Sequence, residues 1–279
     1  SFDRQCSNLP ITFTNNSNLG YYHAWSFGDT DSSTVKDPKH LYLNHGVYNV
    51  QLEVYSANGC YDDTVQTVLV DTIPNANFSF NTVCEGQPIL FNNSTTLESG
   101  IMSYSWAFGD ANFSNLISPS NLYALPGSYN INLVASNSYG CIDSISKVGS
   151  VKPRPNVNFT AVNQCLGTGI TFNNTSGILT GTMTYNWEMG DATTYTNLTS
   201  PMHTYMLDGK YEVLLEATSD FGCKDTILDS VEVFQIPYVN FGDTIRTCSS
   251  YFNLDAANVG SSYIWSNNLT SKAILVTSS

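Results

Sequence analysis

The chain has 279 residues and a net charge of −13, and tyrosine (17) and phenylalanine (14) are abundant in it. One hydrophobic core rarely serves a chain of this length, so we expect several domains. The ten Lys and Arg residues are scattered singly, which argues against a nucleic-acid partner, and no apolar run is long enough to span a bilayer, which argues against direct membrane insertion.

A five-residue pattern recurs along the chain. Residues 25–29 read Trp-Ser-Phe-Gly-Asp, and related stretches begin at Trp106 and Trp187, 81 residues apart each time (106 − 25 and 187 − 106). A fixed period with the same residue types indicates an array of one module. The alternating rings predict a core strand, and Gly-Asp predicts a tight loop after it, because glycine permits positive φ and aspartate accepts backbone hydrogen bonds. The expected repeat-core residues are Trp25, Phe27, Gly28, Asp29, Trp106, Phe108, Gly109, Asp110, Trp187, Met189, Gly190 and Asp191.

The other elements of each module follow in a constant order. An apolar strand such as residues 11–13 comes first, then an Asn-rich turn, the Trp strand, and a proline four residues before a tyrosine. Next comes a strand with strict apolar-polar alternation, such as residues 46–54, and a Gly-Cys turn leads into the last strand. Period-two alternation indicates strands with one buried face. Six or seven short strands in about 80 residues predict an all-β fold class of small two-sheet sandwiches.

Prolines mark the predicted module boundaries. They stand at positions 74, 153, 155 and 237. The short connections contain no flexible Gly/Ser tract, so we expect semi-rigid modules in an extended series. The predicted domains are residues 1–74, 75–153 and 154–236, with a partial, truncated fourth module at 237–279.

The seven cysteines fall in phase with the repeat, two in each module. No CxxC spacing or Cys-His cluster suggests zinc, so we expect one disulfide per module and an oxidising, extracellular compartment. Each loop closure would stabilise a module by about 4 kcal/mol. The expected pairs are Cys6–Cys60, Cys84–Cys141 and Cys165–Cys223, with Cys248 left over.

Several polar residues are candidates for chemistry. His40 and His203 occupy one repeat position at which Asn121 also stands, which favours a packed, hydrogen-bonded role over catalysis. The motif aspartates could ligate a structural calcium ion, but no EF-hand-like spacing of carboxylates surrounds them, so turn capping is favoured. We expect no other cofactor or metal. No nucleophile elbow or paired-carboxylate site is evident, and we expect no enzyme.

The combination Trp-x-Phe-Gly-Asp, Pro-x-His-x-Tyr and Gly-x-Tyr-x-Val-x-Leu resembles the PKD (polycystic kidney disease) domain family, an Ig-like β-sandwich. The resemblance covers residues 1 to about 236, with Asn121 in place of the histidine and Met189 in place of the phenylalanine. The stretch after Trp265 lacks Gly-Asp and is similar to a related Ig-like module. The Gly-Cys turns and the asparagine-rich composition resemble large Bacteroidota surface proteins, among them gliding-motility adhesins exported by the type IX secretion system.

An Asp-Ser/Thr-aliphatic pattern resembles the O-glycosylation sequon of Bacteroidota. The alternative is that polar-Thr-aliphatic is ordinary strand sequence. The residues that would carry sugar are Thr64, Thr72, Ser144, Thr226, Ser230 and Thr244.

We therefore expect a non-catalytic stalk or filament segment of a secreted cell-surface adhesin. Its partners would be neighbouring repeats and an unidentified surface glycan or protein. The sequence leaves self-association open. The alternative function is a set of accessory modules in a secreted polysaccharide- or protein-degrading enzyme.

Overall fold

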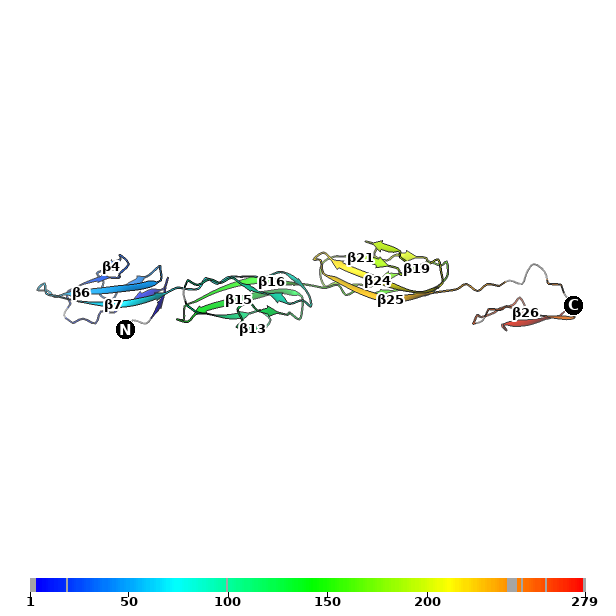
Figure 1. The fold of residues 1–279 in the computed structure, drawn as a ribbon, viewed down its shortest axis with the longest axis horizontal. Helices are drawn as coiled ribbons and strands as arrows, with labels where there is room; N and C mark the ends of the chain where they lie inside the picture. Colours follow the sequence, from blue (N-terminus) through cyan, green and yellow to red (C-terminus); the bar gives the residue numbers. More distant parts are fainter. Residues whose placement is uncertain are drawn as a thin grey trace. The chain divides into compact units, whose positions relative to one another are not determined.

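A computed structural model describes residues 4–18, 20–98, 100–239, 245–246, 248–258 and 260–277 of the protein. Every regular element within these ranges is a β-strand (Figure 1), so the predicted all-β class is confirmed. The chain divides into two compact units, residues 1–153 and 154–279.

The first module of the first unit has a five-stranded sheet in the order β1-β7-β6-β3-β4 and a two-stranded sheet of β2 and β5. The short strand β1 runs parallel to β7, with Cys6 opposite Asp71, and the remaining pairs are antiparallel. The strands are β1 (Gln5–Cys6), β2 (Pro10–Thr12), β3 (Tyr22–Ser26), β4 (Ser32–Ser33), β5 (Lys39–Leu41), β6 (Gly46–Tyr55) and β7 (Tyr61–Asp71).

The second module repeats this arrangement. Its larger sheet has the order β13-β12-β15-β16-β9, and two small sheets pair β10 with β14 and β11 with β8. The parallel pair is β9 with β16, where Cys84 lies opposite Lys152. The strands are β8 (Phe78–Ser79), β9 (Val83–Cys84), β10 (Ile89–Leu90), β11 (Asn92–Asn93), β12 (Met102–Ala107), β13 (Phe113–Ser114), β14 (Ser120–Asn121), β15 (Gly127–Asn137) and β16 (Ile142–Lys152).

The second unit begins with the third module, whose larger sheet has the order β18-β25-β24-β21-β22. Its strands are β17 (Phe159–Thr160), β18 (Gln164–Cys165), β19 (Ile170–Thr171), β20 (Asn173–Asn174), β21 (Met183–Glu188), β22 (Thr194–Thr196), β23 (Met202–His203), β24 (Gly209–Ser219) and β25 (Lys224–Phe234). Near the end of the chain, β26 (Tyr251–Asp255) and β27 (Ala273–Thr277) form an antiparallel pair.

Each module is built around its motif tryptophan. The indole rings of Trp106 and Trp187 are fully buried, and that of Trp25 is nearly so. Each indole N–H donates a hydrogen bond to a backbone carbonyl in the loop that follows, which satisfies the one polar atom of the ring. The expected core strand is therefore present three times.

The motif glycine is required twice over, by backbone conformation and by space. Gly28 has φ of +83°, and a Cβ atom there would lie 2.7 Å from the carbonyl oxygen of Asn49. Gly109 is held in the same way against Asn130. A side chain at this position would therefore meet both left-handed strain and a backbone clash.

Candidate functional site

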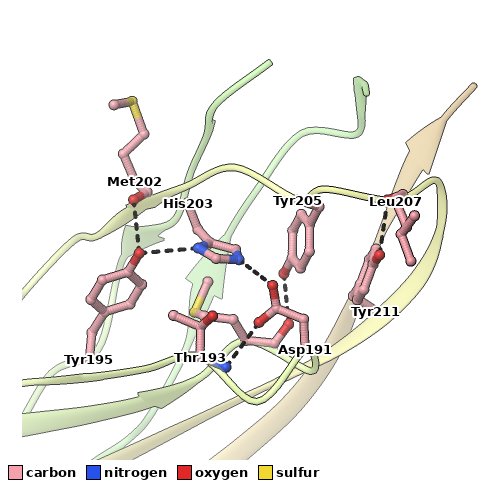
Figure 2. Close-up of polar contacts among 9 residues, drawn as sticks. Asp191, Thr193, Tyr195, Met202, His203, Tyr205, Leu207 and Tyr211 are labelled. Carbon is pink, nitrogen blue, oxygen red and sulfur yellow. Dashed lines mark hydrogen bonds and ion pairs between the residues drawn. The ribbon is translucent and has the colours of Figure 1, made fainter. Parts of the chain in front are cut away.

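A polar network links the motif loop to the strand that follows it. In the third module, Nε2 of His203 lies 2.8 Å from Oδ2 of Asp191 (Figure 2), and the Thr193 N–H donates to Oδ1 of the same carboxylate at 3.0 Å. The hydroxyl of Tyr195 lies 3.1 Å from Nδ1 of His203. Burial raises the pKa of Asp191, but the hydrogen bonds from His203 and Thr193 outweigh burial and hold that pKa below its usual value.

The other modules make the same bonds to the motif aspartate with different residues. His40 Nε2 lies 2.7 Å from Asp29 Oδ2 in the first module. In the second, the Asn121 amide donates to Asp110 Oδ2 at 2.7 Å. An amide therefore serves as well as an imidazole, and the expected packed, hydrogen-bonded role of this position is what the geometry supports. The motif aspartates also accept the backbone N–H two residues on, as turn capping requires.

Asp29, Asp31 and His40 form a group whose candidate ligand atoms lie within 4.8 Å of one another. Hydrogen bonds already engage both oxygens of Asp29. The positions that correspond to Asp31 hold Asn112 and Thr193. The contacts that recur in all three modules are therefore those of loop capping rather than of a shared metal centre.

A buried tyrosine completes each network, and sequence reasoning missed its partner. The hydroxyls of Tyr42, Tyr123 and Tyr205 donate to backbone carbonyls of the motif, at 2.8 to 2.9 Å. Burial raises the pKa of Tyr123 to about 12, so its hydroxyl stays protonated and remains a donor. The constant proline-to-tyrosine offset was a visible signal, but it does not say that the ring returns to the motif carbonyl.

A disulfide bond joins two modules rather than closing one. Cys6 of the first module is bonded to Cys141 of the second, across 135 residues and with a Cα–Cα distance of 5.6 Å. Cys60 and Cys165 are free, exposed thiols. The three predicted pairings within modules are therefore wrong. Cys84 and Cys223 are disulfide-bonded, and Cys248 is free, as predicted.

The two cysteines of one module cannot bond each other because the last strand of the module is long. Cys60 immediately precedes β7, whereas Cys6 lies opposite Asp71 at the other end of β7. Eleven residues of strand (71 − 60) span about 36 Å. A disulfide requires Cα atoms within about 7 Å. The two cysteines of one module thus stand at its opposite ends, and each can reach only a neighbouring module.

The junction between the first two modules carries further contacts around the disulfide. The buried Asn137 amide donates to the Thr72 carbonyl at 2.9 Å, while its Oδ1 accepts the N–H of Cys141. The guanidinium of Arg4 lies 3.7 Å from the centre of the Tyr139 ring, a cation–π contact. Asn137 therefore both shapes the turn that holds Cys141 and binds the preceding module. The sequence gives no local sign of these roles.

An exposed ion pair also lies at this junction. His45 Nδ1 of the first module is 3.0 Å from Glu98 Oε2 of the second. Both side chains are substantially exposed, so the pair adds little stability. It nevertheless marks the rim of a groove of about 390 Å³ between the two modules, with Leu43, Ile73 and Leu97 in its walls.

The aspartate of the proposed glycosylation pattern has a structural role. Asp143 Oδ2 accepts the backbone N–H of Ala76, where the chain enters the second module. The corresponding Asp225 bonds Arg154 at the entry to the third, with 2.7 Å between Oδ1 and Nη2. The aspartate of the Asp-Ser/Thr-aliphatic pattern therefore has a structural role in these two modules, because it binds the segment by which the chain enters the module.

The proposed sugar-bearing residues differ in accessibility. Thr64, Ser144 and Thr226 are exposed, and Ser230 is half-buried, so glycosylation at these four stays a prediction. Thr72 is only 7% exposed and its hydroxyl is buried, so a glycan has no room there and that prediction is wrong. Thr244 lies outside the described residues.

In the part of the chain that the structure describes, no helix has the length and apolar character needed to cross a membrane. Disulfides persist in oxidising compartments. The disulfide between the first two modules, together with the domain type identified below, indicates an extracellular protein.

Comparisons with known proteins agree with the repeat. The model of the family described as PKD domain matches residues 4–70, 71–152 and 150–233. The PKD1 domain of Vibrio anguillarum Epp is similar at 28% identity, with 29% of this chain and 95% of that domain covered and a TM-score of 0.27. The PKD1 domain of the Vibrio cholerae metalloprotease PrtV is similar at 28% identity, with 28% and 96% covered and a TM-score of 0.26. An I-band fragment of titin matches at 14% identity over 83% of this chain and 95% of the fragment, with a TM-score of 0.42. The chain belongs to the PKD domain family and carries three copies of the domain in tandem.

Proposed function

We propose that the chain is a non-catalytic stalk segment of an extracellular cell-surface adhesin. The stalk holds an adhesive region, which contacts a surface glycan or protein, away from the cell. We further propose that this adhesin is of the gliding-motility type that Bacteroidota export by type IX secretion. The Gly-Cys turns and the asparagine-rich composition support this part of the proposal. The single observation that carries it is the Cys6–Cys141 bond between neighbouring domains.

This bond changes how the chain bears tension. Force applied at the N-terminus reaches Cys6, crosses the sulfur bridge, and continues from Cys141. The core of the first domain lies between these cysteines and is therefore outside the loaded path. A covalent bypass of this kind resists extension without any ligand or reaction, which suits a load-bearing spacer better than a binding pocket.

The side chains that could have supported an enzyme serve the fold instead. His203 and Asp191 bond each other and the neighbouring Thr193 and Tyr195. His40 is stacked on Phe27, with ring centroids 4.1 Å apart. The bond from the histidine or asparagine to the motif aspartate recurs in each domain, which favours a structural repeat over three catalytic domains in series.

Single-molecule force spectroscopy of the full chain tests the mechanical claim. The Cys6–Cys141 bridge prevents a segment of 135 residues from being extended by force. This segment corresponds to about 45–49 nm of extended chain. We expect the extension released on full unfolding to increase by at least this amount when the bridge is reduced. In a chain that also carries Cys84→Ala and Cys223→Ala, which removes the other disulfide-bonded cysteines, Cys6→Ala/Cys141→Ala should show a gain of about this size without reductant, whereas Cys60→Ala/Cys165→Ala should not. Equal extension with and without the bridge would refute the load-bearing role.

A further inference from the structure

The last strand of the second module, β16, has an open edge. Among the residues that the structure describes, the strand beside β16 on this side is β9, which pairs only with Val151 and Lys152. The Lys152 carbonyl points to this edge, because it accepts the Glu85 N–H at 2.8 Å. Backbone groups alternate between the two sides of a strand. Every second residue from Ser150 back to Ile142 therefore offers its N–H and C=O to the edge, which is a template for one more strand.

The third module covers the corresponding edge with side chains. Arg154 Nε donates to the Lys224 carbonyl at 3.1 Å. At the other end, Asn163 Oδ1 accepts the Glu232 N–H at 2.9 Å. Lys224 and Glu232 stand at the two ends of the stretch that corresponds to residues 142–150. These bonds close the ends of that edge to a further strand.

The sequence of β16 is self-complementary in the antiparallel direction. A two-fold axis through Ile145 sets each residue opposite the one equally far along on the other side. The facing residues then match as two aliphatic side chains, two opposite charges and two hydroxyls. The pairs are Ile142 with Val148, Asp143 with Lys147, and Ser144 with Ser146. Aliphatic and oppositely charged pairs at facing positions stabilise antiparallel strands.

The same register also satisfies the backbone of the open edge. Ser144 and Ser146 both offer their backbone groups to the edge, by the alternation that starts at Lys152. When two such residues face each other across an antiparallel pair, they exchange both N–H···O bonds. A shift by one residue would lose these bonds and turn the side chains to the wrong faces. The register that matches the side chains is therefore one that the backbone can form.

The last strands of the other two modules lack this match. In the third module Asp225 would face Asp229, and like charges at facing positions are destabilising. In the first module Asp62 would face the uncharged Gln66. Charged residues on edge strands ordinarily prevent pairing between proteins. In β16 they are arranged so that the pairing of two identical strands is attractive.

We propose that the second module is a homophilic contact site, at which β16 pairs antiparallel with β16 of a second copy of this chain about a two-fold axis at Ile145. The contact is isologous, so assembly through it stops at the dimer. The two second modules run in opposite directions, which suits stalks that project from two facing cells. This last step rests on the proposed stalk function, whereas the pairing itself does not.

Sedimentation equilibrium of the full chain measures the pairing. The free thiols Cys60, Cys165 and Cys248 are replaced by serine, so that disulfide exchange cannot link the copies. We expect a reversible equilibrium between monomer and dimer. A chain that stays monomeric at about 1 mM, where a contact of millimolar Kd already populates the dimer, would overturn the proposal. Assembly beyond the dimer would overturn it as well. Either result leaves the stalk function to the force measurement above.

Charge reversal tests the facing pair. In the dimer Lys147→Asp sets an aspartate against Asp143 at two places, so the Kd should rise about tenfold or more. Asp143→Lys sets lysines against each other with the same result. An equimolar mixture of the two variants should recover the dimer, because opposite charges face each other again. Lys210→Asp changes the net charge equally at an exposed position of β24 and should leave the Kd unchanged. No recovery in the mixture, or equal weakening by Lys210→Asp, would contradict the assigned pairing.

Engineered cysteines test the register and leave Asp143 and Lys147 in place. Ser144 and Ser146 are exposed, and in the thiol-free chain each is replaced by cysteine in a separate variant. Across the axis the two positions lie about 5.5 Å apart between Cα atoms, within the range of a disulfide. Two copies of one variant hold their cysteines diagonally, at about 7–8 Å. In oxidised glutathione we expect the mixture of Ser144→Cys and Ser146→Cys to crosslink severalfold more than either variant alone. Equal yields would mean that the strands do not pair in this register, and the proposal would fail.

Discussion

Cys6 and Cys141 are bonded to each other although they lie in different domains. Each stands at one end of its domain's last strand, so the bond can form only where the end of one domain meets the hairpin of the next. The PKD repeat is therefore a covalently linked series in this part of the chain, and its stability is shared between neighbours.

Removal of this bond should destabilise the first unit more than removal of any free thiol. A loop of 135 residues corresponds to about 5 kcal/mol on the loop-entropy account, and measured losses for native disulfides are about 2–5 kcal/mol. We expect Cys141→Ala to lower the first urea transition, followed by tryptophan fluorescence under oxidising conditions. Cys60→Ala is the matched control and should change stability by less than about 0.5 kcal/mol. Equal effects of the two substitutions would contradict this assignment.

Two glycines of the second module separate backbone strain from a backbone clash. Gly109 and Gly140 have φ of +81° and +87°, but an added Cβ atom meets the Asn130 carbonyl oxygen at 2.7 Å only at Gly109. We expect Gly140→Ala to cost about 1–2 kcal/mol from the left-handed conformation alone. Gly109→Ala should cost clearly more, because a strand of the core must move. Equal losses in urea unfolding would mean that the clash is relieved without cost.

The parts of the fold that follow from local pattern could be predicted from the sequence. The burial of Trp106 and the turn after Gly109 were predictable because period-two alternation and a recurring Gly-Asp report the conformation of their own segment. The tyrosine bond to the motif was not predictable, because Tyr123 and Phe108 are brought together only when the two sheets pack.

The disulfide pairing shows where repeat reasoning fails. An in-phase spacing says that Cys6 and Cys84 are equivalent, but not which end of the domain each occupies. The strand length between Cys60 and Asp71 carried that information, since one extended strand separates the two cysteines of a module. The roles of Asn137 and Arg4 could not have been predicted in this way, because their partners, the Thr72 carbonyl and the Tyr139 ring, lie in the neighbouring module.

The histidine of the motif network should be replaceable by asparagine. Asn121 makes the same bond to Asp110 that His203 makes to Asp191, at 2.7 and 2.8 Å. We expect His203→Asn to cost less than about 1 kcal/mol, and His203→Ala to cost about 1–3 kcal/mol because the Asp191 oxygen loses its partner. Urea unfolding of the third domain measures both. If His203→Asn proves as damaging as His203→Ala, the imidazole has a role that the repeat does not explain.

The stability of the third domain should fall on acidification through Asp191. Its pKa in the folded chain is held below the usual value of about 4, so the unfolded chain binds a proton more readily than the folded one. The stabilisation is therefore fully present above the unfolded pKa and is lost as the pH falls through the folded pKa. We expect Asp191→Asn to flatten the dependence of the urea midpoint on pH below about 4, where Asn still donates or accepts but does not titrate. Asp208→Asn, at an exposed position of the same domain, should leave the slope unchanged. If Asp191→Asn also leaves the slope unchanged, the hydrogen bonds from His203 and Thr193 do not favour the charged carboxylate in the folded domain.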